Sequence, residues 1–174
     1  ADGRFVAFES VATDLIGSDT NGISDIFVRD RVAGTTVRVS VDSTGAEIVP
    51  FGGFFDLGSY GASISADGSF VSFLCDSTGV TAEAVPGGVP NAFRASNPPG
   101  GTTVLVSITT AGVGAASGIP GASISGNGQF VAFPAFDTDL VIPATSGVQH
   151  VFVRDLTGGT TELISQSTAG LEGN

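Results

Sequence analysis

The stretch ADGRFVAF at residues 1–8 recurs as ADGSFVSF at residues 66–73 and as GNGQFVAF at residues 126–133. The copies begin 65 and 60 residues apart, a spacing that fits one supersecondary unit per copy. In each copy an Asp-Gly or Asn-Gly turn precedes a short apolar run, which is typical of a β-hairpin. The repeat predicts a single domain made of three stacked β units, roughly residues 1–65, 66–125 and 126–174.

The composition supports a folded chain that is rich in strands. The sequence has 174 residues, is 41% hydrophobic and contains 26 glycines. That length suffices for one domain with a substantial core, and no helical periodicity lasts longer than a turn or two. We expect an all-β fold with almost no helix.

Each unit contains four strand candidates, and small residues suit the short strand that leads into each Asp-Gly hairpin. Eleven strands are expected, at residues 5–8, 25–29, 35–41, 61–65, 70–73, 91–94, 102–108, 121–125, 130–133, 150–155 and 160–165.

These phrases resemble the TolB-like β-propeller repeats, in which Ser-x-Asp-Gly-x-x-Val-Ala-Phe is followed by a strand ending Phe-Val-x-Asp and by Gly-x-Thr-x-x-Val-Ser. The resemblance covers nearly the whole chain. It implies blades of four antiparallel strands around a channel, in proteins that bind proteins, glycans or peptides and are sometimes fused to hydrolases. The second unit departs from the pattern after Phe93, so a site built on Arg29-Asp30 or Arg154-Asp155 would not be threefold.

The expected strands do not divide evenly into blades of four. In chain order they give three strands of one blade, one whole blade, and one further blade, so three repeats have one strand missing at the chain end. Ordinary closed propellers have about four to eight blades. We therefore expect a single propeller or part-propeller whose open blade edge pairs with copies of the chain, as a ring or filament, or with adjoining repeats of a longer chain.

The charge is strongly acidic, with 17 acidic residues, six arginines and no lysine. Phosphate binding needs clustered cations, so nucleic acid is excluded as a partner. No 18-residue apolar segment is present, so no membrane span is expected, and without an initiator methionine or leader the chain reads as a mature or excised piece. Acidity and family habit favour an extracellular or cell-envelope location.

The loop Asp19-Thr20-Asn21-Gly22-Ile23-Ser24-Asp25 is the candidate metal site. Oxygen side chains at alternate positions, a glycine and a later carboxylate resemble the first half of a calcium loop, although the distal glutamate of an EF-hand is missing. Calcium is the candidate cofactor, held by Asp19, Asn21, Asp25 and the Ile23 carbonyl. The alternative is a polar loop whose side chains bond its own backbone.

The apolar insertion at residues 48–57 is the candidate interface, through Phe51, Phe54, Phe55 and Leu57. The second unit has a shorter connection without aromatic residues. Clustered phenylalanines in a connection indicate either an interface or a cap on the core. In an up-and-down blade this insertion should lie beside the Asp19 loop.

No catalytic constellation stands out. Cys75 lies in an apolar run and is expected to be buried. His150 is the only histidine, and no Ser-His-Asp ordering around it can be defended. The chain is therefore expected not to be an enzyme. The leading hypothesis is a noncatalytic structural module that self-assembles. The alternatives are a calcium-supported glycan- or protein-binding propeller and a noncatalytic fragment of a propeller-fused hydrolase.

Overall fold

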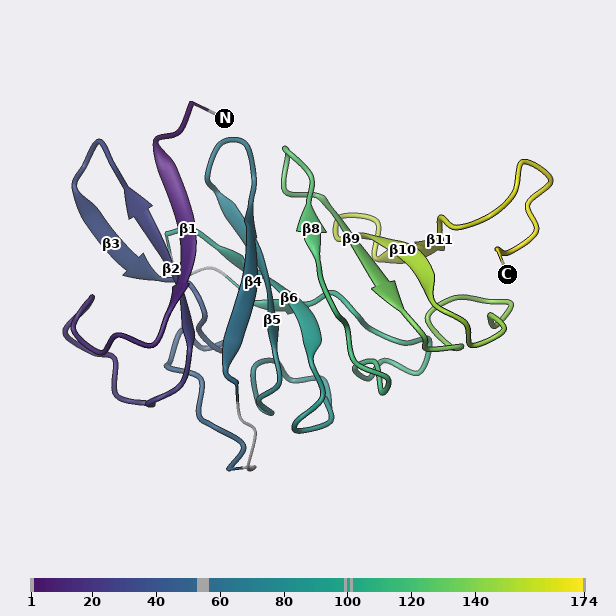
Figure 1. The fold of residues 1–174 in the computed structure, drawn as a ribbon, viewed down its shortest axis with the longest axis horizontal. Helices are drawn as coiled ribbons and strands as arrows, with labels where there is room; N and C mark the ends of the chain where they lie inside the picture. Colours follow the sequence, from purple (N-terminus) through teal and green to yellow (C-terminus); the bar gives the residue numbers. More distant parts are fainter. Residues whose placement is uncertain (1, 53–56, 99, 101, 174) are drawn as a thin grey trace.

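The chain forms three antiparallel sheets in a row in a computed structural model that describes residues 2–52, 57–98, 100 and 102–173 (Figure 1). The first sheet contains β1 (Phe5–Ser10), β2 (Asp25–Asp30) and β3 (Thr35–Arg38). The second contains β4 (Ser59–Ile64), β5 (Phe70–Cys75), β6 (Asn91–Ser96) and β7 (Val104–Leu105). The third contains β8 (Ser123–Ile124), β9 (Phe130–Ala135), β10 (His150–Asp155) and β11 (Thr160–Leu163).

The predicted all-β fold of propeller-type blades is confirmed, and each of the eleven expected strands is present. The second and third sheets have four strands each, whereas the first has three within the described residues. In the second sheet the order β4-β5-β6-β7 runs from the first strand in sequence to the last. By comparison, no strand among the described residues pairs with β1 on the side opposite β2.

The repeat phrase forms a hairpin because its polar residues satisfy the turn. Between β4 and β5, the N–H of Gly68 donates to the Ser65 carbonyl, and Asp67 accepts the N–H of Ser69. Gly68 has φ 76°, a left-handed conformation that a glycine adopts without steric cost. The hairpin between β8 and β9 uses Gly128 in the same way.

The last strand of each sheet is shorter than predicted. The sequence predicts a strand over 35–41, but β3 ends at Arg38, where the N–H groups of Val39 and Ser40 both point at the Ile26 carbonyl, at 2.8 and 3.4 Å. Two residues opposite one carbonyl make a bulge that ends the ladder. The equivalent pairs in the other sheets are Val106 and Ser107 on Ala92, and Ile164 and Ser165 on Val151.

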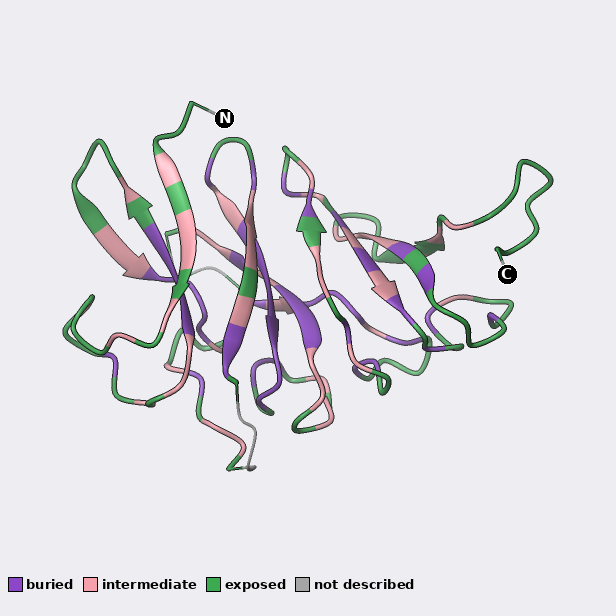
Figure 2. Cartoon of the chain, viewed as in Figure 1, coloured by how far each residue is buried: buried purple, intermediate pink, exposed green. Residues whose placement is uncertain are grey.

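The hydrophobic core lies between the sheets, as two clusters. One joins the first two sheets and includes Ile26, Phe73 and Phe93, and the other joins the second and third and includes Phe133 and Phe152. Figure 2 shows the buried residues along the strands and exposed residues in most turns. Cys75 belongs to the first cluster, as expected from its apolar surroundings in sequence. Within the described residues, no helix is long and apolar enough to cross a membrane.

Candidate functional site

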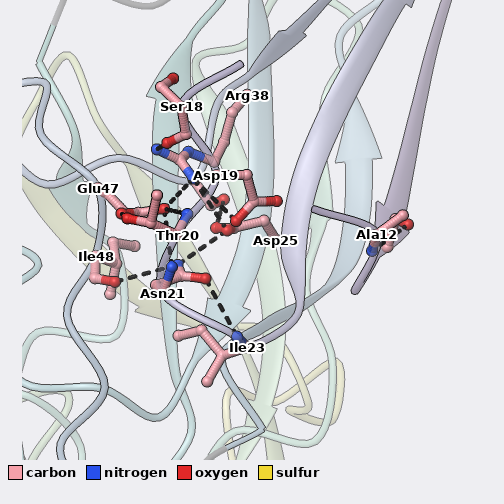
Figure 3. A network of polar contacts seen from close by, with 12 residues as sticks. Ala12, Ser18, Asp19, Thr20, Asn21, Ile23, Asp25, Arg38, Glu47 and Ile48 are labelled. Carbon is pink, nitrogen blue, oxygen red and sulfur yellow. Dashed lines mark hydrogen bonds and ion pairs between the residues drawn. The ribbon is translucent and has the colours of Figure 1, made fainter. Parts of the chain in front are cut away.

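The four residues of the predicted metal loop lie where the connection from β1 enters β2, and Asp19 and Asp25 are both buried there (Figure 3). The Asn21 amide nitrogen donates to the Asp25 carboxylate at 2.9 Å and to the Ile48 carbonyl at 3.2 Å. Its side-chain oxygen accepts the N–H of Ile23 at 3.1 Å. Asn21 therefore turns a nitrogen, not an oxygen, toward Asp25, as in a polar loop that bonds its own backbone.

A buried arginine lies among the carboxylates. One terminal nitrogen of Arg38 is 2.6 Å from Glu47, 3.3 Å from Asp25 and 3.5 Å from Asp19. The other donates to the Ser18 carbonyl at 3.2 Å. In this structure the positive charge beside the three carboxylates is the guanidinium of Arg38.

Glu47 is the most firmly held of the three carboxylates. It accepts hydrogen bonds from the N–H and the hydroxyl of Thr20, each at 2.7 Å, and from Arg38. Partial burial acts to raise the pKa of Glu47, but the bonds from Thr20 and Arg38 outweigh it and lower the pKa to about 2. Glu47 is therefore a fixed anion at neutral pH.

Asp19 and Asp25 differ in how they are satisfied. Burial raises the pKa of Asp25, against the opposing effects of hydrogen bonds from Ser40 and Asn21. Asp19 is buried, and neither of its carboxylate oxygens accepts a hydrogen bond from the described residues. The nearest oxygens of Asp19, Asp25 and Glu47 lie within 4.8 Å of one another, so three carboxylates face one guanidinium.

Asp25 also takes part in a contact that every sheet repeats. The Ser40 hydroxyl donates to the Asp25 carboxylate and accepts the Ile26 N–H at 2.9 Å. We call this serine with its strand-entrance partner the entrance latch. The other two entrance latches are Ser107 with Asn91 at 2.8 Å and Ser165 with His150 at 2.9 Å.

The partner of the serine in the entrance latch is a carboxylate in one sheet, an amide in another and an imidazole in the third. Because the contact persists although the partner changes, it belongs to the scaffold. Only the first unit adds the arginine: Arg38 lies opposite Phe27, where Leu105 and Leu163 occupy the equivalent register positions of the other sheets. Glu47 does have an equivalent, because it forms an isolated bridge with Val41 as Glu172 does with Gln166.

The candidate interface residues do not share one environment in the structure. Phe51 packs on the connection before β6, so closely that a Cβ on Gly87 or Gly88 would lie 3.2 or 3.1 Å from its ring. Leu57 is exposed, and its N–H donates to Asp76. Phe54 and Phe55 lie outside the described residues. The insertion does lie beside the Asp19 loop, since the Asn21 side chain donates to the carbonyl of Ile48, the first residue of the insertion, at 3.2 Å.

Sequence reasoning found the loop but not its partners. Arg38 lies within the expected strand 35–41 with no role predicted for it, and Glu47 belongs to no candidate site. The signal that was available is the repeat itself, because aligning the units puts Arg38 where the others have a leucine.

The fold is similar to that of several solved structures. TolB from Acinetobacter baumannii matches 98% of this chain at 16% identity and a TM-score of 0.51, and a putative TolB from Agrobacterium tumefaciens matches 93% at 19% and 0.52. The tricorn protease matches 95% at 14% identity and 0.51. The chain spans 32%, 45% and 12% of the lengths of these three proteins.

No protein-family description matches this sequence, and no curated protein sequence matches it. At these identities the structural likeness shows the fold alone, which is a TolB-like β-propeller-type fold.

Proposed function

We propose that this chain is a noncatalytic structural module that self-associates by pairing its open blade edge with a strand of another copy. Adjoining repeats would supply that strand instead if the chain is part of a longer one. The observation that supports this proposal is the free side of β1: the corresponding strands β5 and β9 each have a neighbour, β4 and β8, on that side.

The backbone groups available on this edge follow from the pairing of β1 with β2. Arg31 donates its N–H to the Arg4 carbonyl, so Arg4 is a hydrogen-bonded position of the antiparallel ladder. Bonded and free positions alternate along such a strand. The N–H and carbonyl groups of Phe5, Ala7 and Glu9 therefore point away from β2. An edge of this kind is a template for another strand.

The contacts of the titratable residues support a structural role. Asp25 is engaged by Ser40 and Arg38, and His150 by Ser165, all as parts of the scaffold. We place the module outside the cell or in its envelope on the strength of its acidic composition. The hydrolase-fragment alternative stays a prediction, to be tested by assaying the chain with and without added hydrolase domains.

The test uses the purified chain in sedimentation equilibrium over a wide concentration range. We expect concentration-dependent association, and roughly tenfold weakening in Ala7→Pro, because proline removes the outward N–H without taking a donor from the β1–β2 ladder. Ala7→Val keeps the N–H and adds similar bulk, so it serves as the control. A wild type that stays monomeric throughout would contradict the proposal.

A calcium-supported binding module is the second candidate, favoured by the buried Asp19 carboxylate that accepts no hydrogen bond from the described residues. An ion there would have to share or replace the contacts of Arg38. If calcium binds, adding it should raise the melting temperature of the wild type but not that of Asp19→Asn. Asp139→Asn, which alters an exposed acid elsewhere, is the control. A melting temperature that calcium and chelator leave unchanged removes this candidate.

A further inference from the structure

The two joints between adjacent sheets share one close contact. A Cβ on Gly68 would lie 2.2 Å from the Phe5 ring, and a Cβ on Gly128 would lie 2.3 Å from the Phe70 ring. In both joints the phenylalanine that opens one sheet's repeat strand packs on the turn glycine of the following sheet. The contact needs glycine, because any side chain there would overlap the ring.

Each end of the row carries an unused half of this contact. Phe130 is the third copy of the phenylalanine and is 37% exposed. Gly3 is the first copy of the turn glycine, at φ 74°, and a Cβ there would meet only Arg31, at 3.7 Å, among the described residues. The third sheet has the ring without a glycine, and the first has the glycine without a ring.

The outer side of the third sheet also exposes residues whose equivalents in the other two sheets are buried in the core. Val151 is 41% and Ile164 is 46% exposed, and they are joined by the bond from the Ile164 N–H to the Val151 carbonyl. We call Phe130, Val151 and Ile164 the tail face. Four residues hold the positions of Val151 and Ile164 in the first two sheets, and all are 0% exposed: Ile26, Val39, Ala92 and Val106.

The outer side of the first sheet is the complementary half. Val6 is 43% and Leu15 is 36% exposed, and we call Gly3, Val6 and Leu15 the head face. At the 65- and 60-residue spacings of the repeat, their equivalents lie within the joints and are at most 2% exposed: Val71, Val80, Val131 and Leu140. Burying such side chains in an interface would stabilise it.

The charges on the two faces are also opposite. The head face is flanked by Arg29, at the β2 position that Ala95 holds in β6, and the tail face by Glu162, at the β11 position that Val37 holds in β3. Both residues are exposed. A joint between the two faces would place one cation and one anion in the same interface.

We propose that the tail face of one copy packs on the head face of a second copy and repeats the joint seen twice inside the chain. This inference rests on the proposed self-association and adds to the pairing of the β1 edge a second contact, in which one sheet packs on another. The contact is heterologous, so it closes into a ring or continues as a filament. Two copies of three sheets make six blades, within the usual range of about four to eight, whereas three copies would make nine. A two-copy ring is expected.

The experiment compares two single-face variants and their mixture by sedimentation and light scattering. The wild type should have twice the mass of the 17.3 kDa chain. The tail variant Val151→Asp/Ile164→Asp and the head variant Val6→Asp/Leu15→Asp should each stay monomeric where the wild type is dimeric. Their mixture should restore a dimer, because one intact tail face and one intact head face remain. Val32→Asp changes an exposed turn residue and should leave the dimer intact.

The outcomes separate the two proposals. A two-fold interface made of one patch would give no rescue on mixing, and association that ignores both face variants would show that another surface is used; either result overturns the joint and leaves self-association standing. A monomeric wild type overturns both. If further repeats fused to the chain bury the two faces within a single monomer, those repeats are the occupant, and the proposal of a second copy is overturned. Circular dichroism of each variant checks that it folds.

Discussion

The Ser40 hydroxyl links two neighbouring groups at the start of β2: it donates to the Asp25 carboxylate and accepts the N–H of Ile26. All three residues are buried. Removing the hydroxyl would leave a buried donor without its acceptor and would weaken the hold on Asp25.

Ser40→Ala should therefore lower the free energy of unfolding by about 2 kcal/mol, the usual cost of a buried polar group that loses its partner. Ser43→Ala, an exposed serine three residues on, should change it by less than about 0.5 kcal/mol. Urea unfolding measures both. Equal effects of the two substitutions would show that the entrance latch contributes nothing.

Asp25→Asn should be milder than Asp25→Ala, because Asn91 fills the same place in the second sheet and accepts from its serine. The amide keeps an oxygen for Ser40, whereas alanine leaves none. Urea unfolding of the pair gives the comparison, with Asn91→Ala as the equivalent loss in β6. The idea fails if Asp25→Asn and Asp25→Ala unfold at the same denaturant concentration.

Arg38→Leu installs the residue found at this register position in the other sheets, but it leaves three neighbouring carboxylates without their guanidinium. We expect a loss of about 3 kcal/mol at neutral pH, as for other buried pairs that lose one partner. Arg29→Leu, which removes an exposed arginine bonded to Thr36, should cost less than about 1 kcal/mol. A loss no larger for Arg38 than for Arg29 would mean that the cluster is not stabilised by its arginine.

Glu47 should give part of the acid sensitivity of the fold. Its pKa is about 2 in the folded chain and 4.5 when unperturbed, so its contribution is complete above pH 4.5 and is lost as the pH falls toward 2. Asp25, with a raised pKa, acts in the opposite sense. Glu47→Gln should flatten the dependence of unfolding free energy on pH in that window. Parallel curves for the variant and the wild type would contradict this.

Gly68→Ala and Gly79→Ala separate backbone strain from crowding, because both glycines have φ 76°. A Cβ on Gly79 meets nothing within 4 Å, but one on Gly68 would overlap Phe5. Gly79→Ala should cost about 1–2 kcal/mol from its left-handed backbone, and Gly68→Ala clearly more. Adding Phe5→Ala should recover part of the difference in thermal unfolding. If the two alanine variants have the same melting temperature, the Phe5 ring does not require glycine at position 68.

The sequence was informative about strands and uninformative about side-chain partners, for physical reasons. Short apolar runs after an Asp-Gly and an Asn-Gly turn predicted β5 and β9, because apolar runs and turns are local properties of the sequence. The length of β3 was missed because its ladder ends in a bulge on the Ile26 carbonyl, which depends on a neighbouring strand. The ion pair between Arg38 and Glu47 was missed because each residue alone looks like an ordinary surface charge.

Because the entrance latch is present in all three sheets, the cluster of Arg38 with its carboxylates could be rebuilt by design in another sheet. The second sheet is closed to it, because Gly114 stands at the place of Glu47 and a Cβ there would lie 2.6 Å from Val85. The third sheet already has Glu172 at that place. The substitutions His150→Asp and Leu163→Arg would give the third sheet the main charges of the first sheet. Of the two remaining repeats, therefore, the third is open to this design and the second is not.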